Sequence, residues 1–166
     1  MKETLENLVG LTLTDPTVPT PSCVIDSTKL RHNIERAKAK AAALHVGWRP
    51  HLKTHKSIDI ARLQMSSPEG PATVSTLAEA RYFAQNGVKD IIYAVGIAPQ
   101  KLSAVAAIRR ETGCDLKIIL DSVEAAKFVS EFCRRERVLI PVLLEIDTDG
   151  HRSGLVPGAP EIVATA

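Results

Sequence analysis

The 166-residue sequence has only three cysteines and an aromatic content of 4%. An odd number of cysteines without CxxC spacing argues against a disulfide framework and against a zinc ribbon. No apolar run approaches the roughly 20 residues needed to cross a bilayer. At the N-terminus, Glu3 and Glu6 stand where a signal peptide needs a basic start and an apolar run. We therefore expect a reduced, cytoplasmic protein with no membrane partner.

An excess of charge of one sign is also absent. The chain has 21 Lys and Arg against 19 Asp and Glu, for a formal net charge of +2. Proteins that neutralise nucleic-acid phosphates usually show a basic patch, so nucleic acid is not expected as a partner. The 45% hydrophobic content is instead typical of one soluble globular domain that can bury its own core.

Short apolar segments alternate with amphipathic segments along the chain. They predict strands at 22–26, 72–75, 90–95, 115–120 and 138–146, and helices over about 30–44, 57–65, 77–87, 99–112 and 123–132. A short segment, 48–53, leads into the second helix, and Gly47 is expected to end the first. Thr76 and Glu79 have the spacing of a capping box. Apolar strands separated by helices form parallel sheets, so the predicted fold class is α/β.

The number of repeating units leaves two architectures open. Strands begin roughly every 20 to 25 residues, which is the spacing of βα units, and about five units are present. Five units can form an open doubly wound sheet, whereas a closed barrel needs eight. The pattern alone is compatible with either a complete open sheet or part of a barrel.

The polar segment Arg49–Lys56 (RPHLKTHK) lies at a junction between strand and helix, which is the ligand side of α/β folds. Lys53 would stand among the like charges of Arg49, His51 and Lys56, which favour the neutral amine that bonds to a carbonyl carbon. The alternative is an ordinary basic helix N-terminus. The spacing of His51 and His55 would suit zinc on one helix face, but Pro50 and the lack of an HExxH glutamate argue against it. No metal site is therefore predicted.

A second polar segment, 145–154, directly follows the last predicted strand. Its acidic residues imitate the opening of a calcium loop, but Val156 occupies the twelfth position, where a bidentate glutamate is required. We expect instead that Asp147 fixes Arg152, whose planar guanidinium suits a phenolate or a carboxylate. The alternative is a glycine-rich loop with a surface ion pair.

Five segments, taken in order, resemble a known enzyme family. They are 20–26, the RPHLKTHK string 49–56, 73–80 with TVST and EA, 90–99 (DIIYAVGIAP), and 145–154 with EID and HRSG. Over about residues 17–160 they are similar to the D-threonine aldolase and D-serine dehydratase family, which uses pyridoxal phosphate. This resemblance implies that residues 1–21 are a lead. It also implies that residues 22–166 are the N-terminal part of an alanine-racemase-like (β/α)8 TIM barrel, without the family's C-terminal β domain.

The resemblance also implies roles for individual residues. Lys53 matches the lysine that binds pyridoxal phosphate covalently, at the end of the first barrel strand. Arg152 matches an arginine beside the phenolic oxygen of the cofactor. His51, Thr54 and His55 match motif positions near the cofactor. The family's metal ligands lie in the C-terminal β domain, so a divalent metal is expected only in a full-length parent protein.

The implied activity is that of a lyase on D-β-hydroxy amino acids. The substrate would lose either an aldehyde by retro-aldol cleavage or its β-hydroxyl by elimination. An amino-acid racemase and a non-catalytic fragment that binds pyridoxal phosphate are the alternatives. The segment 93–99 favours the D-threonine aldolase branch. A small D-amino acid is the expected partner, together with a second copy of the chain in a homodimer.

Overall fold

The structure, a computed structural model, describes residues 10–166, so the first nine residues of the predicted lead lie outside the described residues. Contacts divide the chain into one unit ending at Ala37 and a second, Lys38–Ala166. Helix α2 (Ser27–Ala43) begins where the carboxylate of Asp26 accepts the backbone N–H groups of Thr28 and Lys29. The predicted strand 22–26 is wrong, because this exposed segment has no ladder partner among the described residues.

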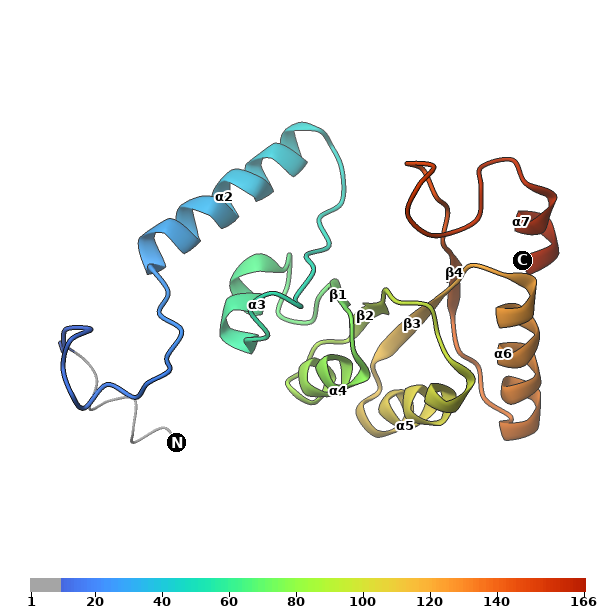
Figure 1. The fold of residues 1–166 in the computed structure, drawn as a ribbon, viewed down its shortest axis with the longest axis horizontal. Coiled ribbons are helices and arrows are strands. Elements are labelled where there is room, and N and C mark those ends of the chain that lie inside the picture. The colour runs from blue at the N-terminus through green and yellow to red at the C-terminus, as the bar shows by residue number, and fades with distance from the viewer. Residues whose placement is uncertain (1–9) are drawn as a thin grey trace. The chain divides into compact units, whose positions relative to one another are not determined.

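The second unit contains a parallel sheet of four strands in the order β1 (Ala72–Val74), β2 (Asp90–Tyr93), β3 (Asp115–Leu120) and β4 (Val142–Leu144) (Figure 1). One row of the register joins Val74, Tyr93, Ile118 and Val142. The strand order follows the chain without reversal. A doubly wound sheet reverses its order at a switch point, so this arrangement is that of a barrel segment.

The first barrel strand expected within 48–53 is reduced to one parallel bridge between His51 and Thr73. Leu52 donates its N–H to Thr73 O, and Thr73 donates to Pro50 O, both at 2.9 Å. Pairing stops there because Pro50 has no N–H to donate and a turn begins at Lys53. Counted with this bridge, five strand positions each precede a helix: α3 (Ile58–Gln64), α4 (Leu77–Gln85), α5 (Leu102–Thr112), α6 (Val123–Glu136) and α7 (Pro160–Thr165). The prediction of about five units is confirmed.

Helix boundaries follow local capping. Ser57, Thr76 and Ser122 each accept, through the side chain, the N–H three residues further on. A short 3-10 helix, η1 (Pro99–Lys101), leads into α5. The prediction that Gly47 ends the first helix is wrong: α2 ends at Ala43, and His45 takes the left-handed conformation with φ 54°. Strand β4 is shorter than the predicted 138–146, and Pro141 directly before it cannot donate to a ladder.

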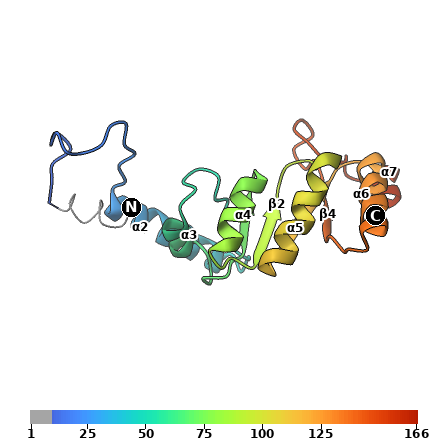
Figure 2. The ribbon, with the colours of Figure 1, turned by 90° about the horizontal axis from the view of Figure 1, so that it is seen from below.

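The core lies between the sheet and helices α4 and α5, which pack side by side (Figure 2). Alternate strand residues such as Val74, Ile91 and Leu116 are fully buried in one cluster with Phe83 and Val105 from these helices. Residues of the opposite sheet face, such as Thr73 and Ile92, are only partly buried. Within residues 10–166, no helix has both the length and the apolar character that a membrane crossing requires.

Candidate active site

Lys53 lies on a tight turn directly after the bridge at His51. The N–H of Lys56 donates to Leu52 O at 3.0 Å and closes the turn, and Lys56 itself has a positive φ of 51°. Lys53 and Thr54 are both exposed. Among the described residues the Lys53 amine makes no hydrogen bond and no ion pair, so it is available to react or to bind an anion.

A pocket of about 420 Å³ opens at the carboxyl ends of the strands. Its lining comes from four of the five strand ends: the Lys53 turn, Ser75 after β1, Val95 after β2, and the loop after β4. Of the four site residues predicted from the sequence, the fold brings His51, Lys53 and Arg152 to this one pocket. Thr54 is on the same turn as Lys53 but does not line the pocket.

The loop after β4 is organised by Asp147. Its carboxylate accepts the backbone N–H groups of Asp149 at 3.2 Å, Gly150 at 2.9 Å and Arg152 at 3.2 Å. Asp147 therefore fixes Arg152 as predicted, through the backbone N–H and not through the guanidinium. The guanidinium makes no hydrogen bond or ion pair within residues 10–166 and is exposed at the pocket.

Gly154 closes this loop against the strand end. It has a φ of 105°, and a Cβ at this position would lie 2.7 Å from Glu145 O and 2.9 Å from Asp147 N. Leu155 N–H donates to Glu145 O, and Asp147 N–H donates to Leu155 O, at 2.8 and 2.9 Å. Only glycine combines this backbone conformation with this close approach, which explains physically the glycine of the HRSG segment.

His51 is held through both ring nitrogens. Its Nδ1 accepts the backbone N–H of Lys53 at 3.3 Å, and its Nε2 lies 3.2 Å from the Ser75 hydroxyl. Because Nδ1 accepts, the proton of the neutral ring is assigned to Nε2, which donates to Ser75. Burial lowers the pKa of His51, the charge of Lys53 lowers it further, and Glu79 acts in the opposite direction without cancelling them.

Glu79 supports this arrangement from helix α4. It is only 7% exposed and accepts the N–H of Ser75 at 2.9 Å, with Lys56 Nζ at 3.4 Å. Burial acts to raise the pKa of Glu79, but the bonds from Ser75 and Lys56 outweigh it, so the pKa is lowered. Of the two hydrogen bonds expected in the predicted capping box, only the first is formed. Thr76 accepts the N–H of Glu79, whereas the return bond goes to Ser75, one residue before the cap.

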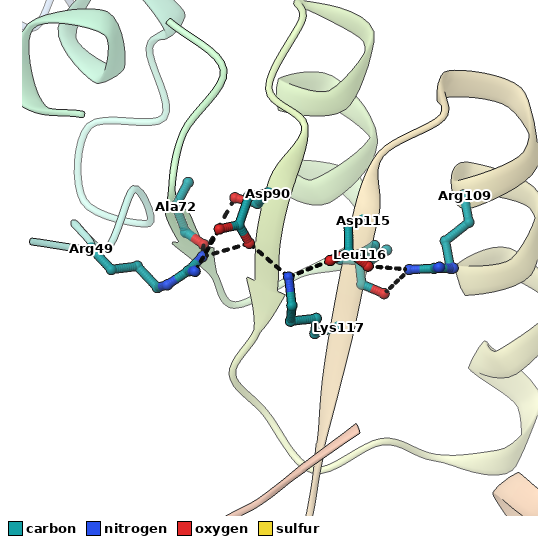
Figure 3. Close-up of polar contacts among 7 residues, drawn as sticks. All are labelled: Arg49, Ala72, Asp90, Arg109, Asp115, Leu116 and Lys117. Atoms are coloured by element: carbon teal, nitrogen blue, oxygen red, sulfur yellow. Dashed lines mark hydrogen bonds and ion pairs between the residues drawn. The ribbon is translucent and has the colours of Figure 1, made fainter. Parts of the chain in front are cut away.

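Two of the cations expected beside Lys53 are paired with carboxylates. Arg49 donates to Asp90 at the amino ends of the strands, away from the pocket (Figure 3), and Lys56 is paired with Glu79. The expectation that their like charges act on Lys53 is therefore wrong. Of the Lys and Arg residues in the RPHLKTHK segment, Lys53 is the one that lines the pocket.

The two histidines of the segment do not form a metal pair. His55 Nδ1 accepts the N–H of Ser57 at 3.0 Å, and its Nε2 bonds to Gln64 Oε1 at 2.9 Å, whereas His51 bonds to Lys53 and Ser75. In the described part of the chain, no group of three or more His, Cys, Asp or Glu side chains is placed to hold a metal ion.

The sequence did not single out Ser75 or Glu79 as site residues. Ser75 follows the last residue of β1, and residues at the carboxyl ends of parallel strands are where functional side chains gather in such folds. That positional rule could have found Ser75. The contact of Glu79 with Ser75 depends on how α4 packs, and the capping-box spacing pointed only to a local role.

Comparison with known proteins places this geometry in a family. Residues 25–166 match the family described as alanine racemase, N-terminal domain. The chain belongs to this family. It is 45% identical to the D-threo-3-hydroxyaspartate dehydratase of Delftia sp. (strain HT23) over 139 residues, which are 84% of this chain and 36% of that protein. The solved structure of that dehydratase superposes with a TM-score of 0.80 at 44% identity, covering 89% of this chain and 38% of the other.

Two further proteins similar to this member of the alanine racemase N-terminal domain family are a dehydratase and an aldolase. The D-serine dehydratase of Dictyostelium discoideum is 32% identical over 148 residues, 83% of this chain and 37% of that protein. The structure of D-threonine aldolase from Filomicrobium marinum superposes with a TM-score of 0.75 at 25% identity, covering 89% of this chain and 40% of the other. The chain thus spans just over a third of the length of the curated relatives it matches.

Proposed function

We propose that this chain carries the cofactor-binding lysine of a pyridoxal-phosphate-dependent lyase that acts on D-β-hydroxy amino acids. The observation that supports it is the meeting of Lys53 and Arg152, two cations without an ion-pair partner in residues 10–166, at one pocket on the carboxyl edge of a barrel segment. The cofactor has an aldehyde that a lysine amine can attack and a phenolic oxygen that a guanidinium can bind. The donor set at this pocket fits both groups.

We assign the reaction to the dehydratase type. The sequence segment 93–99 favoured the aldolase branch, but the similarity favours a dehydratase. Identity is 45% to D-threo-3-hydroxyaspartate dehydratase, and 29% and 25% to two D-threonine aldolases. Loss of a β-hydroxyl from a small D-amino acid is therefore the proposed chemistry, with ammonia and a 2-oxo acid as final products.

Each residue at the pocket has a separate proposed role. Lys53 would hold the cofactor through its amine, and Arg152 would donate hydrogen bonds to the phenolic oxygen. When bound, pyridoxal phosphate supplies an electron sink for negative charge at the substrate's Cα. Because its amine lies at the pocket, Lys53 is also the residue that we assign to take the Cα proton once the substrate's amine has displaced it from the cofactor. The Asp147-fixed loop keeps Arg152 facing the same space.

Labelling with pyridoxal phosphate and borohydride, followed by peptide mapping, tests the cofactor site. The expected result is a pyridoxyl label on Lys53 that Lys53→Ala removes. Lys127→Ala is the matched control, because Lys127 is an exposed lysine on α6, outside this pocket. A label spread equally over surface lysines, unchanged in Lys53→Ala, would overturn the assignment.

Product analysis tests the reaction. With D-threo-3-hydroxyaspartate or D-serine, a dehydratase releases ammonia and a 2-oxo acid, whereas an aldolase acting on D-threonine releases glycine and an aldehyde. We expect the first pair of products in a protein that contains this segment, and their loss in Lys53→Ala. Glycine and aldehyde as products would replace the dehydratase assignment with the aldolase, and a labelled protein without turnover would reduce the function to cofactor binding.

A further inference from the structure

The backbone of the proposed cofactor lysine is held by an imidazole. His51 Nδ1 accepts the Lys53 N–H at 3.3 Å, across a turn whose other side is closed by the bond from Lys56 N–H to Leu52 O. We propose that His51 is a positioning residue for Lys53, acting as a neutral imidazole whose Nδ1 holds the lysine turn at the pocket. The proposal rests on the proposed function, since it assigns a role within the same site.

A chain of hydrogen bonds sets the orientation of the ring. Buried Glu79 accepts the N–H of Ser75 at 2.9 Å, and this fixes the residue whose hydroxyl accepts the proton on His51 Nε2. With Nε2 donating, Nδ1 can only accept, and the Lys53 N–H supplies that proton. Each side chain in the series orients the next, as outer partners do around metal-bound histidines.

The charges around His51 come from three sides. Lys53 is on the same turn, Glu79 with its partner Lys56 faces it from the α4 side, and the loop after β4 contributes Glu145, Asp147, Asp149 and Arg152 to the pocket. The pKa of His51 is lowered, chiefly by burial, so the neutral form is favoured. A protonated ring would present an N–H from Nδ1 to the N–H of Lys53. Two donors cannot bond, so protonation releases the turn.

Two isosteric variants separate the two bonds of the ring. His51→Asn keeps an acceptor oxygen near the position of Nδ1 and does not titrate near neutral pH. His51→Gln keeps a donor near the position of Nε2 and lacks the acceptor for Lys53. Circular dichroism and the thermal midpoint establish that each variant is folded. The proposal predicts that Asn substitutes for histidine in holding Lys53 and that Gln does not.

Amide hydrogen exchange at Lys53, followed by NMR, tests the hold without any cofactor. In His51→Gln, which loses the acceptor for the Lys53 N–H, we expect exchange about three- to tenfold faster than in wild type. In His51→Asn, which retains an acceptor, we expect a rate close to that of wild type. Equal exchange rates in wild type and His51→Gln, or slower exchange in Gln than in Asn, would overturn the proposal.

The rate of pyridoxyl labelling at Lys53 tests the consequence for the site. The pH dependence of the cofactor aldehyde is common to wild type and His51→Asn, and it cancels in the ratio of their rates. This ratio is expected to stay constant above pH 6.5, the ordinary value for histidine, and to fall as the pH drops through the lowered pKa of His51. A ratio that is flat down to pH 5 would contradict the proposal.

The two arms distinguish this proposal from the proposed function. If no variant and no wild-type chain is labelled at Lys53, the cofactor assignment fails, while the exchange measurement still decides whether His51 holds the turn. If Lys53 is labelled but exchange and labelling are identical in all three proteins, the cofactor assignment stands and the positioning role is refuted.

Discussion

Arg49 donates to both carboxylate oxygens of Asp90, at 3.0 and 2.7 Å. This bidentate pair lies where two strands begin, because Arg49 also donates to Ala72 O at the start of β1, and Asp90 is the first residue of β2. Lys117 on β3 joins Asp90 at 2.9 Å and Asp115 at 2.5 Å (Figure 3). The amino ends of the strands are thus tied together by charge, while the cations at the carboxyl ends are left for a ligand.

Asp90→Asn is expected to lower the free energy of unfolding by about 1–2 kcal/mol, because Arg49 and Lys117 lose the charged carboxylate to which they donate. The loss is no larger because solvent screens these partly exposed charges. Urea denaturation measures the change. Asp59→Asn is the matched control, because the Asp59 side chain is 89% exposed and lies 4.0 Å from Arg62. We expect its effect to stay within about 0.5 kcal/mol. Equal effects of the two substitutions would argue against a stabilising role of the network.

Stability is expected to fall on acidification. Burial acts to raise the pKa of Asp90 and Glu79, but their hydrogen bonds and cationic partners outweigh it, so both pKa values are lowered. The two ionised carboxylates therefore stabilise the folded state fully at pH values above their ordinary pKa values, 3.8 for Asp and 4.5 for Glu. This stabilisation is lost as the pH falls below those values and through the lowered pKa values of the folded state. Urea midpoints measured between pH 3 and 7 should show the fall. Asp90→Asn should flatten it, and an unchanged slope in that variant would refute the assignment.

Gly154→Ala is expected to disrupt the loop that carries Arg152. The added Cβ meets backbone atoms at 2.7 and 2.9 Å, and φ is 105°, so we expect a loss of about 2–4 kcal/mol or a displaced loop. Gly150→Ala is the matched control. It has a φ of 74° and no atom within 4 Å of the new Cβ, so only the conformational cost of about 1 kcal/mol remains. Thermal unfolding compares the two, and a larger loss in Gly150→Ala would contradict the close approach.

Asp147→Ala is expected to loosen the loop after β4 while leaving the sheet intact. The carboxylate holds three backbone N–H groups, so exchange at Asp149, Gly150 and Arg152 should rise together, by about tenfold. Amides of β3 report on the sheet and should not change. Asp149→Ala is the control, because among the described residues its side chain accepts no hydrogen bond. Unchanged exchange in Asp147→Ala would show that the backbone alone keeps this loop in place.

Local features were predictable because their physical causes are local. Thr76 and Ser122 cap their helices with their side-chain oxygens. Ser and Thr directly before an amphipathic segment are typical N-cap residues, so these caps could be predicted. The apolar stretches 90–93 and 115–120 form buried parallel strands. Ser22–Asp26 is the exception, since apolar residues there predicted a strand but no partner strand lies beside it among the described residues.

Partners of charged side chains could not be predicted, because they depend on which elements the fold brings together. Proximity in sequence placed Arg49 and Lys56 beside Lys53, but Arg49 pairs with Asp90 and Lys56 with Glu79. Asp147 does fix Arg152, but only the structure shows that the bond goes to the backbone, because the turn at Gly150 brings backbone N–H groups to the carboxylate.

The α/β class, the succession of βα units and the candidate lysine could be predicted from the residues alone, because periodicity, capping and a dense motif are properties of short segments. That the strands follow one another without reversal, and that Lys53 and Arg152 face one pocket, became visible only in the folded chain. The same holds for the hydrogen bonds by which His51 connects Lys53 to Ser75 and Glu79. These relationships join residues from different strand ends, and their distances are set by sheet register and helix packing.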